Sequence, residues 1–380
     1  MELKKKIRLG VMFGGRSGEH EVSLASARSI LEVIDYERYS VTQIGITQDG
    51  IWLSKKDNSS TSVIDSFLQK SYDGLEEVFM LPSPAYRGIL YRKSAKSLSV
   101  LEQEVFVELD AIFPVLHGTF GEDGTLQGLF ELNDIAYVGA GVVSSAVGMD
   151  KAIFKSLMQA YHLPTVEWLC VFKSEIEQNA KKVSLNVMAD LPYFPLFVKP
   201  ANLGSSVGIS KCSCQDDLIK GLLFAATYDR KVIVERGVNA REIEISVLGN
   251  EQPLVSEPGE VIPSREFYSY EAKYIDNRSE LLIPAPLSDE QKKKVQELAL
   301  RAYQAVDCSG MARVDFLMDK DTEELYISEI NTIPGFTQIS MYPKLWQRSG
   351  ISYSTLVDRL IELAFQRREE KEQIKYRRDE

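Results

Sequence analysis

Residues 311–335 read MARVDFLMDKDTEELYISEINTIPG, in which two strand-like runs flank a polar, hairpin-like gap. Because side chains alternate along a strand, Arg313 and Asp315 are expected on one face, beside Glu329 and Asn331 of the neighbouring strand. Two carboxylates and an amide are oxygen ligands that suit Mg²⁺ bound to a nucleoside triphosphate. A salt-bridged hairpin that faces water is the alternative, since charged residues at alternating positions are usually solvated.

A turn follows directly at residues 332–335, where the Pro-Gly pair reverses the chain. Such a turn can direct the Gly335 amide toward the same centre as the Arg313 guanidinium. A pair of donors in that position would stabilise a developing oxyanion, and removing one donor typically costs about 3 kcal/mol of transition-state stabilisation. An ordinary turn without a ligand is the alternative interpretation.

A candidate phosphate cradle lies at residues 199–208, KPANLGSSVG. Lys199 leaves a strand end, and Ser205 and Ser206 lie in the Gly/Ser loop, whose amides and hydroxyls can approach phosphate oxygens. The chain has neither the G-x-x-x-x-G-K-[ST] motif nor a strand-linked G-x-G-x-x-G, so the P-loop and the dinucleotide fingerprint are excluded. Taken alone, the segment could equally be a solvent-exposed loop between two strands.

Composition narrows the class of protein. A chain of 380 residues is expected to divide into two or three domains, with room for a cleft between them. The net charge of −11 argues against nucleic acid as a partner, because phosphate-backbone binding needs clustered Lys and Arg. No apolar run approaches the ~20 residues that cross a bilayer, so no membrane contact is expected. The four cysteines include no CxxC pair, which favours a reducing cytoplasm.

The periodicity of apolar residues predicts an α/β opening followed by α+β segments. Strands are expected at 7–13, 39–46, 109–116, 166–172, 196–199, 232–235, 242–248, 311–318 and 324–330, and helices at 22–34, 151–161 and 353–365. Residues 54–99 are polar and low in pattern, which indicates a peripheral insertion. The expected domains are 1–139, 140–235 and 236–380.

The order of Lys199 with its loop, Glu235, Glu242 and the group at 313–331 resembles the ATP-grasp fold, in which two α+β domains clamp ATP. Four motifs narrow the resemblance to D-alanine:D-alanine ligases, namely GGRSGEHEVS at 14–23, HGTFGEDG at 117–124, EFYSYEAKY at 266–274 and EINTIPGFTQISMY at 329–342. The similarity covers about 7–365 without 54–99. It implies an N-terminal parallel-sheet domain that binds substrate, then a central and a C-terminal ATP-grasp domain.

The resemblance implies the following substrate contacts. Glu19 would take the ammonium of the first D-alanine, and Arg313 with the Gly335 amide would hold the carboxylate that becomes an acyl phosphate. Ser340 and the Met341 amide would receive the carboxylate of the second substrate.

The resemblance also implies a lid loop at 261–283, closed over the site by a hydrogen-bonded group of Glu19, Ser205 and Tyr274. His117 would bind substrate, with Glu122 nearby. Outside this motif, a lone histidine in a turn is more often structural.

Nucleotide and metal contacts follow from the same resemblance. The phosphates of ATP would contact Lys151, Lys199, Ser206 and Lys273. The adenosine would be held by Glu235 and Glu242, and the purine pocket would be lined by Phe267 and Met318. Two Mg²⁺ ions, with Mn²⁺ as an alternative, would be bound by Asp315, Glu329 and Asn331.

The implied activity is ATP-dependent ligation of two D-alanines through D-alanyl phosphate, which supplies peptidoglycan precursors. The family alone implies a homodimer. D-Serine or D-lactate as the second substrate is an alternative, but ester-forming relatives present histidine where this chain has Tyr274, so an amine acceptor is favoured. A catalytically silent ATP-binding regulator is a further alternative, opposed by the presence of both metal-type and substrate-type groups.

Overall fold

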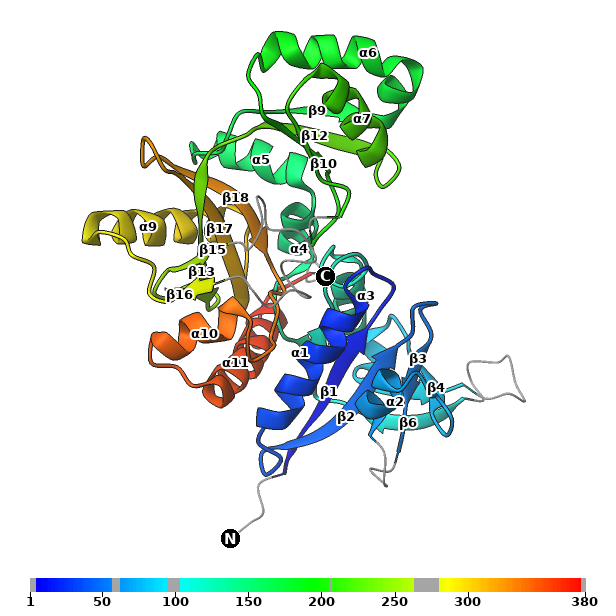
Figure 1. Cartoon of the computed structure of the whole chain (residues 1–380). Coiled ribbons are helices and arrows are strands. Elements are labelled where there is room, and N and C mark those ends of the chain that lie inside the picture. The colour runs from blue at the N-terminus through cyan, green and yellow to red at the C-terminus, as the bar shows by residue number, and fades with distance from the viewer. Residues whose placement is uncertain (1–4, 57–61, 94–102, 206, 263–279, 377–380) are drawn as a thin grey trace.

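The computed structural model describes residues 5–56, 62–93, 103–205, 207–262 and 280–376. Within them the chain forms three sheets, each with its own helices (Figure 1). The predicted α/β and α+β character is therefore confirmed. None of the described helices is both long enough and apolar enough to span a membrane.

The first sheet has the strand order β6-β5-β4-β3-β2-β1-β7-β8. Its parallel half contains β1 (Ile7–Gly14), β2 (Tyr39–Ile46), β7 (Ala111–Val115) and β8 (Ala136–Tyr137). Its antiparallel half contains β3 (Trp52–Ser54), β4 (Glu76–Met80), β5 (Ile89–Arg92) and β6 (Glu104–Glu108). The accompanying helices are α1 (His20–Val33), α2 (Val63–Leu68), η1 (Pro84–Tyr86), α3 (Thr125–Asn133) and α4 (Val142–Met149).

The segment expected to be a peripheral insertion is integrated into this domain. In its described part, β4 and β5 extend the sheet at its edge, which is a peripheral position. The α2 helix, however, places Phe67 in the main core with 1% exposure, edge-on to Phe13. Gly45 makes this packing available, because a Cβ there would lie 2.2 Å from the Phe67 ring. The described part of residues 54–99 is therefore an extension of the sheet that also contributes to the core, although its sequence showed little pattern.

The second sheet is antiparallel, with the order β11-β10-β12-β9. Its strands are β9 (Trp168–Phe172), β10 (Leu196–Pro200), β11 (Ser210–Cys212) and β12 (Lys231–Arg236), and its helices are α5 (Lys151–Ala160), α6 (Lys173–Asp190) and α7 (Gln215–Ala225). Helix α5 begins where the sequence predicts, because the Asp150 carboxylate accepts from the first free amides, those of Ala152 and Ile153.

The third sheet has the order β16-β15-β13-β17-β18, with β14 beside β13. Its strands are β13 (Ala240–Leu248), β14 (Leu254–Val255), β15 (Gly259–Ile262), β16 (Glu280–Leu282), β17 (Met311–Asp319) and β18 (Leu325–Asn331). Helix α9 (Asp289–Ala305) packs on one face, where Ile243, Ile245 and Val314 are buried. The opposite face carries charged residues, among them Arg313 and Asp315 of β17 and Glu329 of β18.

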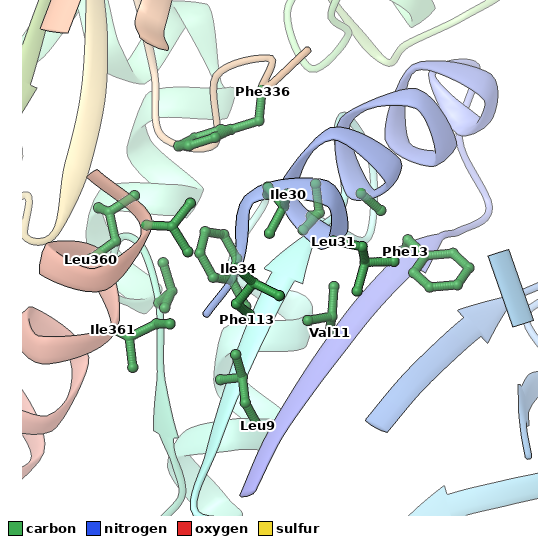
Figure 2. Close-up of a cluster of buried hydrophobic side chains, with 14 of the residues drawn as sticks. Leu9, Val11, Phe13, Ile30, Leu31, Ile34, Phe113, Phe336, Leu360 and Ile361 are labelled. Carbon is green, nitrogen blue, oxygen red and sulfur yellow. The ribbon is translucent and has the colours of Figure 1, made fainter. Parts of the chain in front are cut away.

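Of the last two helices, α10 (Met341–Arg348) packs against β13 of the third sheet, and α11 (Tyr353–Glu372) returns to the first domain. Figure 2 shows Leu360 and Ile361 of α11 across a shared core from Leu9 and Val11 of β1. Helix α11 contacts β7 and β8, and it is longer than the predicted 353–365. The expected domains 1–139 and 236–380 therefore do not pack as separate units, because this core combines both ends of the chain.

Candidate active site

One cavity lies where the three sheets meet, and described residues from every domain line it. Its lining comprises Glu19, Val22, His117, Glu122, Gly148, Met149, Lys151, Leu203, Gly204, Ser205, Arg313, Glu329, Ile330, Asn331, Thr332, Ile333, Pro334 and Gly335. Glu19, Arg313, Gly335, Glu329 and Asn331, which were predicted to hold the first substrate and the metal, are thus brought together from positions about three hundred residues apart in sequence, while the predicted metal ligand Asp315 is not among the lining residues.

Glu19 lies at the N-terminus of α1, where its carboxylate faces the Gly118 loop of its own domain and the Gly204 loop of the second domain. Its Oε1 accepts a hydrogen bond from the Ser205 hydroxyl; Tyr274, the third member of the predicted group, lies outside the described residues. A Cβ on Gly118 or Gly204 would lie 2.6 or 2.7 Å from Glu19 Oε2, so only glycine leaves room for the carboxylate in this position. Ser205 adopts a left-handed φ of 51°, an uncommon conformation for a residue with a side chain.

His117 is buried, and protein groups bond both of its ring nitrogens. Nδ1 lies 2.8 Å from the Ile333 carbonyl, so it must carry the proton, and Nε2 then accepts from Ser26 Oγ at 3.0 Å. Burial lowers the pKa of His117, although Glu19 acts in the opposite direction. The imidazole is therefore neutral and lines the cavity. Its two nitrogen atoms are hydrogen-bonded to α1 and to the segment before Gly335.

Glu122 faces the same cavity. Burial raises its pKa well above the usual range, and the neighbouring Glu19 raises it further. The structure therefore places a carboxyl that favours its neutral form beside one that accepts a hydrogen bond from Ser205.

Arg313 and Asp315 point to one face of β17, as the alternation predicted. The guanidinium donates to both oxygens of Asp315, from Nε at 2.7 Å and from Nη2 at 2.6 Å. Its Nε also lies 3.0 Å from Oε2 of Glu244, a buried residue opposite Asp315 on β13. Glu244 was not among the predicted site residues, although its position two residues after Glu242 places it on the same face of the strand.

The candidate metal ligands meet across the β17–β18 pair. Asp315 lies opposite Glu329 and Arg313 opposite Asn331, and the Asn331 amide donates to Asp315 Oδ2 at 3.0 Å. Among the described residues there is no cluster of three His, Cys, Asp or Glu side chains that could hold a metal. Two carboxylates and one amide fit Mg²⁺ that arrives with nucleotide phosphates, which supply further oxygen ligands.

Two predicted phosphate ligands are bound to protein groups here. Lys151 Nζ donates to the Leu203 carbonyl at 2.6 Å, which ties α5 to the Gly/Ser loop. Lys199 Nζ lies 2.6 Å from Glu235 Oε2, and Lys155 Nζ lies 2.8 Å from Glu235 Oε1. Burial alone would raise the Glu235 pKa, but Lys155 and Lys199 lower it to about 2. Lys155 was also not predicted, although a lysine one turn after Lys151 lies on the same helix face.

Ser340 and Met341 stand at the N-terminus of α10. Ser340 Oγ accepts from the Thr337 amide at 3.0 Å and lies 2.7 Å from Thr337 Oγ1, while a Cβ on Gly335 would lie 3.0 Å from it. The Met341 side chain is buried. Its amide lies at the N-terminal end of the helix, which favours anions. Both residues are adjacent to the cavity through Gly335 and do not line it.

The placement of Met318 in a purine pocket is corrected. Met318 has 1% exposure and packs with Phe316 in the core beneath α9, on the face of β17 away from Asp315. Because side chains alternate, Leu317 shares the face of Asp315 and lies opposite Glu242 on β13. Four predicted residues, and most of the expected lid at 261–283, fall outside the described residues: Ser206, Phe267, Lys273 and Tyr274.

Two protein families match the chain. The family described as D-ala D-ala ligase N-terminus matches residues 8–140, and the family described as D-ala D-ala ligase C-terminus matches residues 157–362. These matches cover the first domain and nearly all of the remainder.

Full-length relatives agree. The chain is 48% identical over 374 residues to the D-alanine–D-alanine ligase of Caldicellulosiruptor bescii, covering 98% of this chain and 99% of the relative. It is 49% identical over 369 residues to the D-alanine–D-alanine ligase of Thermoanaerobacter pseudethanolicus, covering 97% and 99%.

Solved structures give the same result. The D-alanine-D-alanine ligase from Coxiella burnetii matches with a TM-score of 0.80 at 35% identity, covering 97% of this chain and 96% of that chain. The VanG D-Ala:D-Ser ligase from Enterococcus faecalis matches with a TM-score of 0.82 at 33% identity, covering 95% and 100%. The motifs, the three-sheet architecture and the matches to relatives over nearly the whole chain all agree. The chain therefore belongs to the D-alanine–D-alanine ligase family.

Proposed function

We propose that this chain joins two molecules of D-alanine, with ATP as the energy source, to make a dipeptide for peptidoglycan precursors. The observation that carries the proposal is the shared cavity, in which Glu19 faces Arg313 and the Gly335 segment across the domain junction. An anion, a cation and a turn amide are the groups needed to hold a zwitterionic amino acid with its carboxylate toward a phosphate donor.

The chemistry has two steps. An oxygen of the first D-alanine carboxylate attacks the γ-phosphorus of ATP, and ADP leaves, which gives an acyl phosphate. The free amine of the second D-alanine then attacks the acyl carbon, and inorganic phosphate leaves with that oxygen. Arg313 and the Gly335 amide orient the carboxylate and stabilise the oxyanion formed in the second step, while Glu19 holds the ammonium.

Asp315, Glu329 and Asn331 fit magnesium and would hold it beside the nucleotide phosphates. When bound, the metal neutralises triphosphate charge during transfer. We propose two ions, with Mn²⁺ as an alternative to Mg²⁺. Lys151 and Lys199 would supply further positive charge to the phosphates. For Lys199 this requires a change of partner, because its ammonium is paired with Glu235.

We propose D-alanine as the second substrate too. Support comes from the relatives named D-alanine–D-alanine ligase, which share 44–49% of their residues with this chain over nearly its whole length. Ser340 and the Met341 amide would receive its carboxylate at the N-terminus of α10. We also propose a homodimer, on the family resemblance, and a cytoplasmic location, which agrees with four free cysteines.

The proposal is tested by phosphate release from ATP and Mg²⁺ with and without D-alanine, followed by mass-spectrometric identification of the product. D-Alanine-dependent phosphate with an equal amount of D-alanyl-D-alanine is expected. A mixture of D-alanine, D-serine and D-lactate should give mainly the D-alanine dipeptide. Phosphate release that is independent of D-alanine would reject the ligase, and a predominant mixed product would reject the proposed acceptor.

A further inference from the structure

Glu235 is a buried carboxylate shared by two lysines from different elements. It lies near the end of β12; Lys199 reaches it from β10 and Lys155 from α5. The two ammonium groups take separate oxygens, Lys155 at Oε1 and Lys199 at Oε2. The triad carries two positive charges and one negative charge, so one lysine exceeds what Glu235 needs for neutrality.

The two lysines differ in access to the outside. The Lys155 side chain is 1% exposed, on a helix that also buries Phe154 and Met158, while the Lys199 side chain is 17% exposed. Lys199 also precedes the Gly/Ser loop that is the candidate phosphate cradle. Only Lys199 can therefore exchange Glu235 for another anion without carrying a fully buried ammonium across apolar surroundings.

We propose that Lys155 is a positioning residue that remains paired with Glu235 when Lys199 moves from Glu235 to a nucleotide phosphate. This inference rests on the proposed function, in which Lys199 contacts ATP. Lys155 has no contact with substrate in this account. It keeps a buried carboxylate compensated, so that Lys199 can be released at low cost.

Without Lys155, the departure of Lys199 would leave Glu235 buried with no cation. A buried carboxylate in that condition either destabilises the complex or binds a proton. The other ionisable groups that act on the triad are Glu329, which influences both lysines, and Glu242, which influences Lys199. Both are acidic, so neither can replace Lys155, and both favour proton uptake by Glu235.

The test measures protons taken up when ADP and Mg²⁺ bind to the full-length protein at pH 7.5. Isothermal titration in two buffers of different ionisation enthalpy gives this number together with the dissociation constant. Lys155→Met removes the charge, and Lys155→Gln removes it but keeps a hydrogen-bond donor should the methionine variant not fold. Lys155→Arg retains the charge and serves as the rescue variant.

Lys231→Met is the matched control. Lys231 is another shielded lysine. It lies on β12 and pairs with Asp150, which takes no part in the proposed exchange. Removing it should lower thermal stability without changing the protons linked to ADP binding.

In Lys155→Met and Lys155→Gln, ADP binding is expected to weaken by about 10- to 100-fold and to take up close to one more proton than in the wild type. Lys155→Arg and Lys231→Met should match the wild-type proton count. Equal proton uptake in wild type, Lys155→Met and Lys155→Gln would overturn the inference. If the wild-type protein neither bound ADP nor released D-alanine-dependent phosphate, the proposed function would fail instead, so the two failures are distinguishable.

Discussion

The Glu19 carboxylate is held in a space bounded by glycines, and this arrangement predicts a loss of activity without a loss of stability. In Gly204→Ala, the new methyl group would lie 2.7 Å from Glu19 Oε2. The end of a flexible side chain can move away, so folding is little affected, but the group proposed to hold the substrate ammonium is displaced. We expect kcat/KM for D-alanine to fall about 100-fold, as for a displacement near 1 Å, with an unchanged melting temperature.

Gly128→Ala is the control for this change. Gly128 lies in α3, where a Cβ would meet nothing within 4 Å, so alanine should add about 0.5–1 kcal/mol of stability and leave the kinetics unchanged. Normal D-alanine kinetics in Gly204→Ala would show that Glu19 does not need its observed position.

Much of the site could be predicted from residue patterns, and the omissions have a physical cause. Arg313, Asp315, Glu329 and Asn331 were found because strand alternation alone places them together. Lys155 lies one turn after Lys151, but its pairing with the buried Glu235 joins positions eighty residues apart, and the pairing of Glu244 with Arg313 is similarly remote. Tertiary packing determines which buried charges pair with each other, and a local sequence pattern does not encode that packing.

The misplacement of Met318 is different, because the alternation that places Arg313 with Asp315 also excludes Met318 from their face. Strand alternation was available from the sequence, and it assigns the purine-pocket position to Leu317.

His117 joins three elements, and its substitution should change how stability depends on pH. It bonds Ser26 of α1 and the Ile333 carbonyl, and Ser26 Oγ accepts from the Phe336 amide. His117→Gln is expected to lower the unfolding free energy by about 1–3 kcal/mol at pH 7.5, through lost buried hydrogen bonds.

The direction of the pH effect follows from the lowered pKa of His117. The unfolded chain binds this proton near pH 6.5, before the folded protein does, so the wild type loses stability as pH falls below 6.5. The variant lacks this contribution, while Glu19 and Glu122 are present in both proteins. Urea unfolding should therefore show a smaller stability difference at pH 5.5 than at pH 7.5. A constant or growing difference would contradict the neutral, buried imidazole.

The predicted strands and helices were found where β-forming runs or capping residues mark them, within a few residues. The antiparallel strands β4, β5 and the edge strand β6 were not predicted, because those strands are short and only partly apolar. The full length of α11 was also missed. Its last turns are charged, and contacts with the first domain hold them in place.

Arg367 connects the two ends of the chain in the folded molecule. Its guanidinium donates to the carbonyls of Tyr137 and Gly139 and to Ser309 Oγ, and it lies 4.2 Å from the centre of the Tyr137 ring. These bonds fasten α11 to the end of the first sheet and to the turn before β17. No local pattern could reveal this connection, since its partners lie 58 to 230 residues away.

Arg367→Gln should therefore destabilise the whole protein by about 1–3 kcal/mol, because buried carbonyls lose their donors. Arg359→Gln, an exposed position on the same helix, should change stability by less than about 0.5 kcal/mol. Urea unfolding of both variants gives the comparison. An equal, small effect would indicate that the apolar core alone fixes α11.

In the proposed reaction, a carboxylate is activated by phosphoryl transfer in the cavity between Glu19 and Arg313. D-Alanine labelled with ¹⁸O in its carboxylate, incubated with unlabelled ATP and Mg²⁺, tests this directly, because the bridging oxygen of an acyl phosphate leaves with phosphate. Mass spectrometry should find one ¹⁸O atom in each inorganic phosphate released. Unlabelled phosphate accompanying dipeptide formation would contradict the acyl-phosphate route.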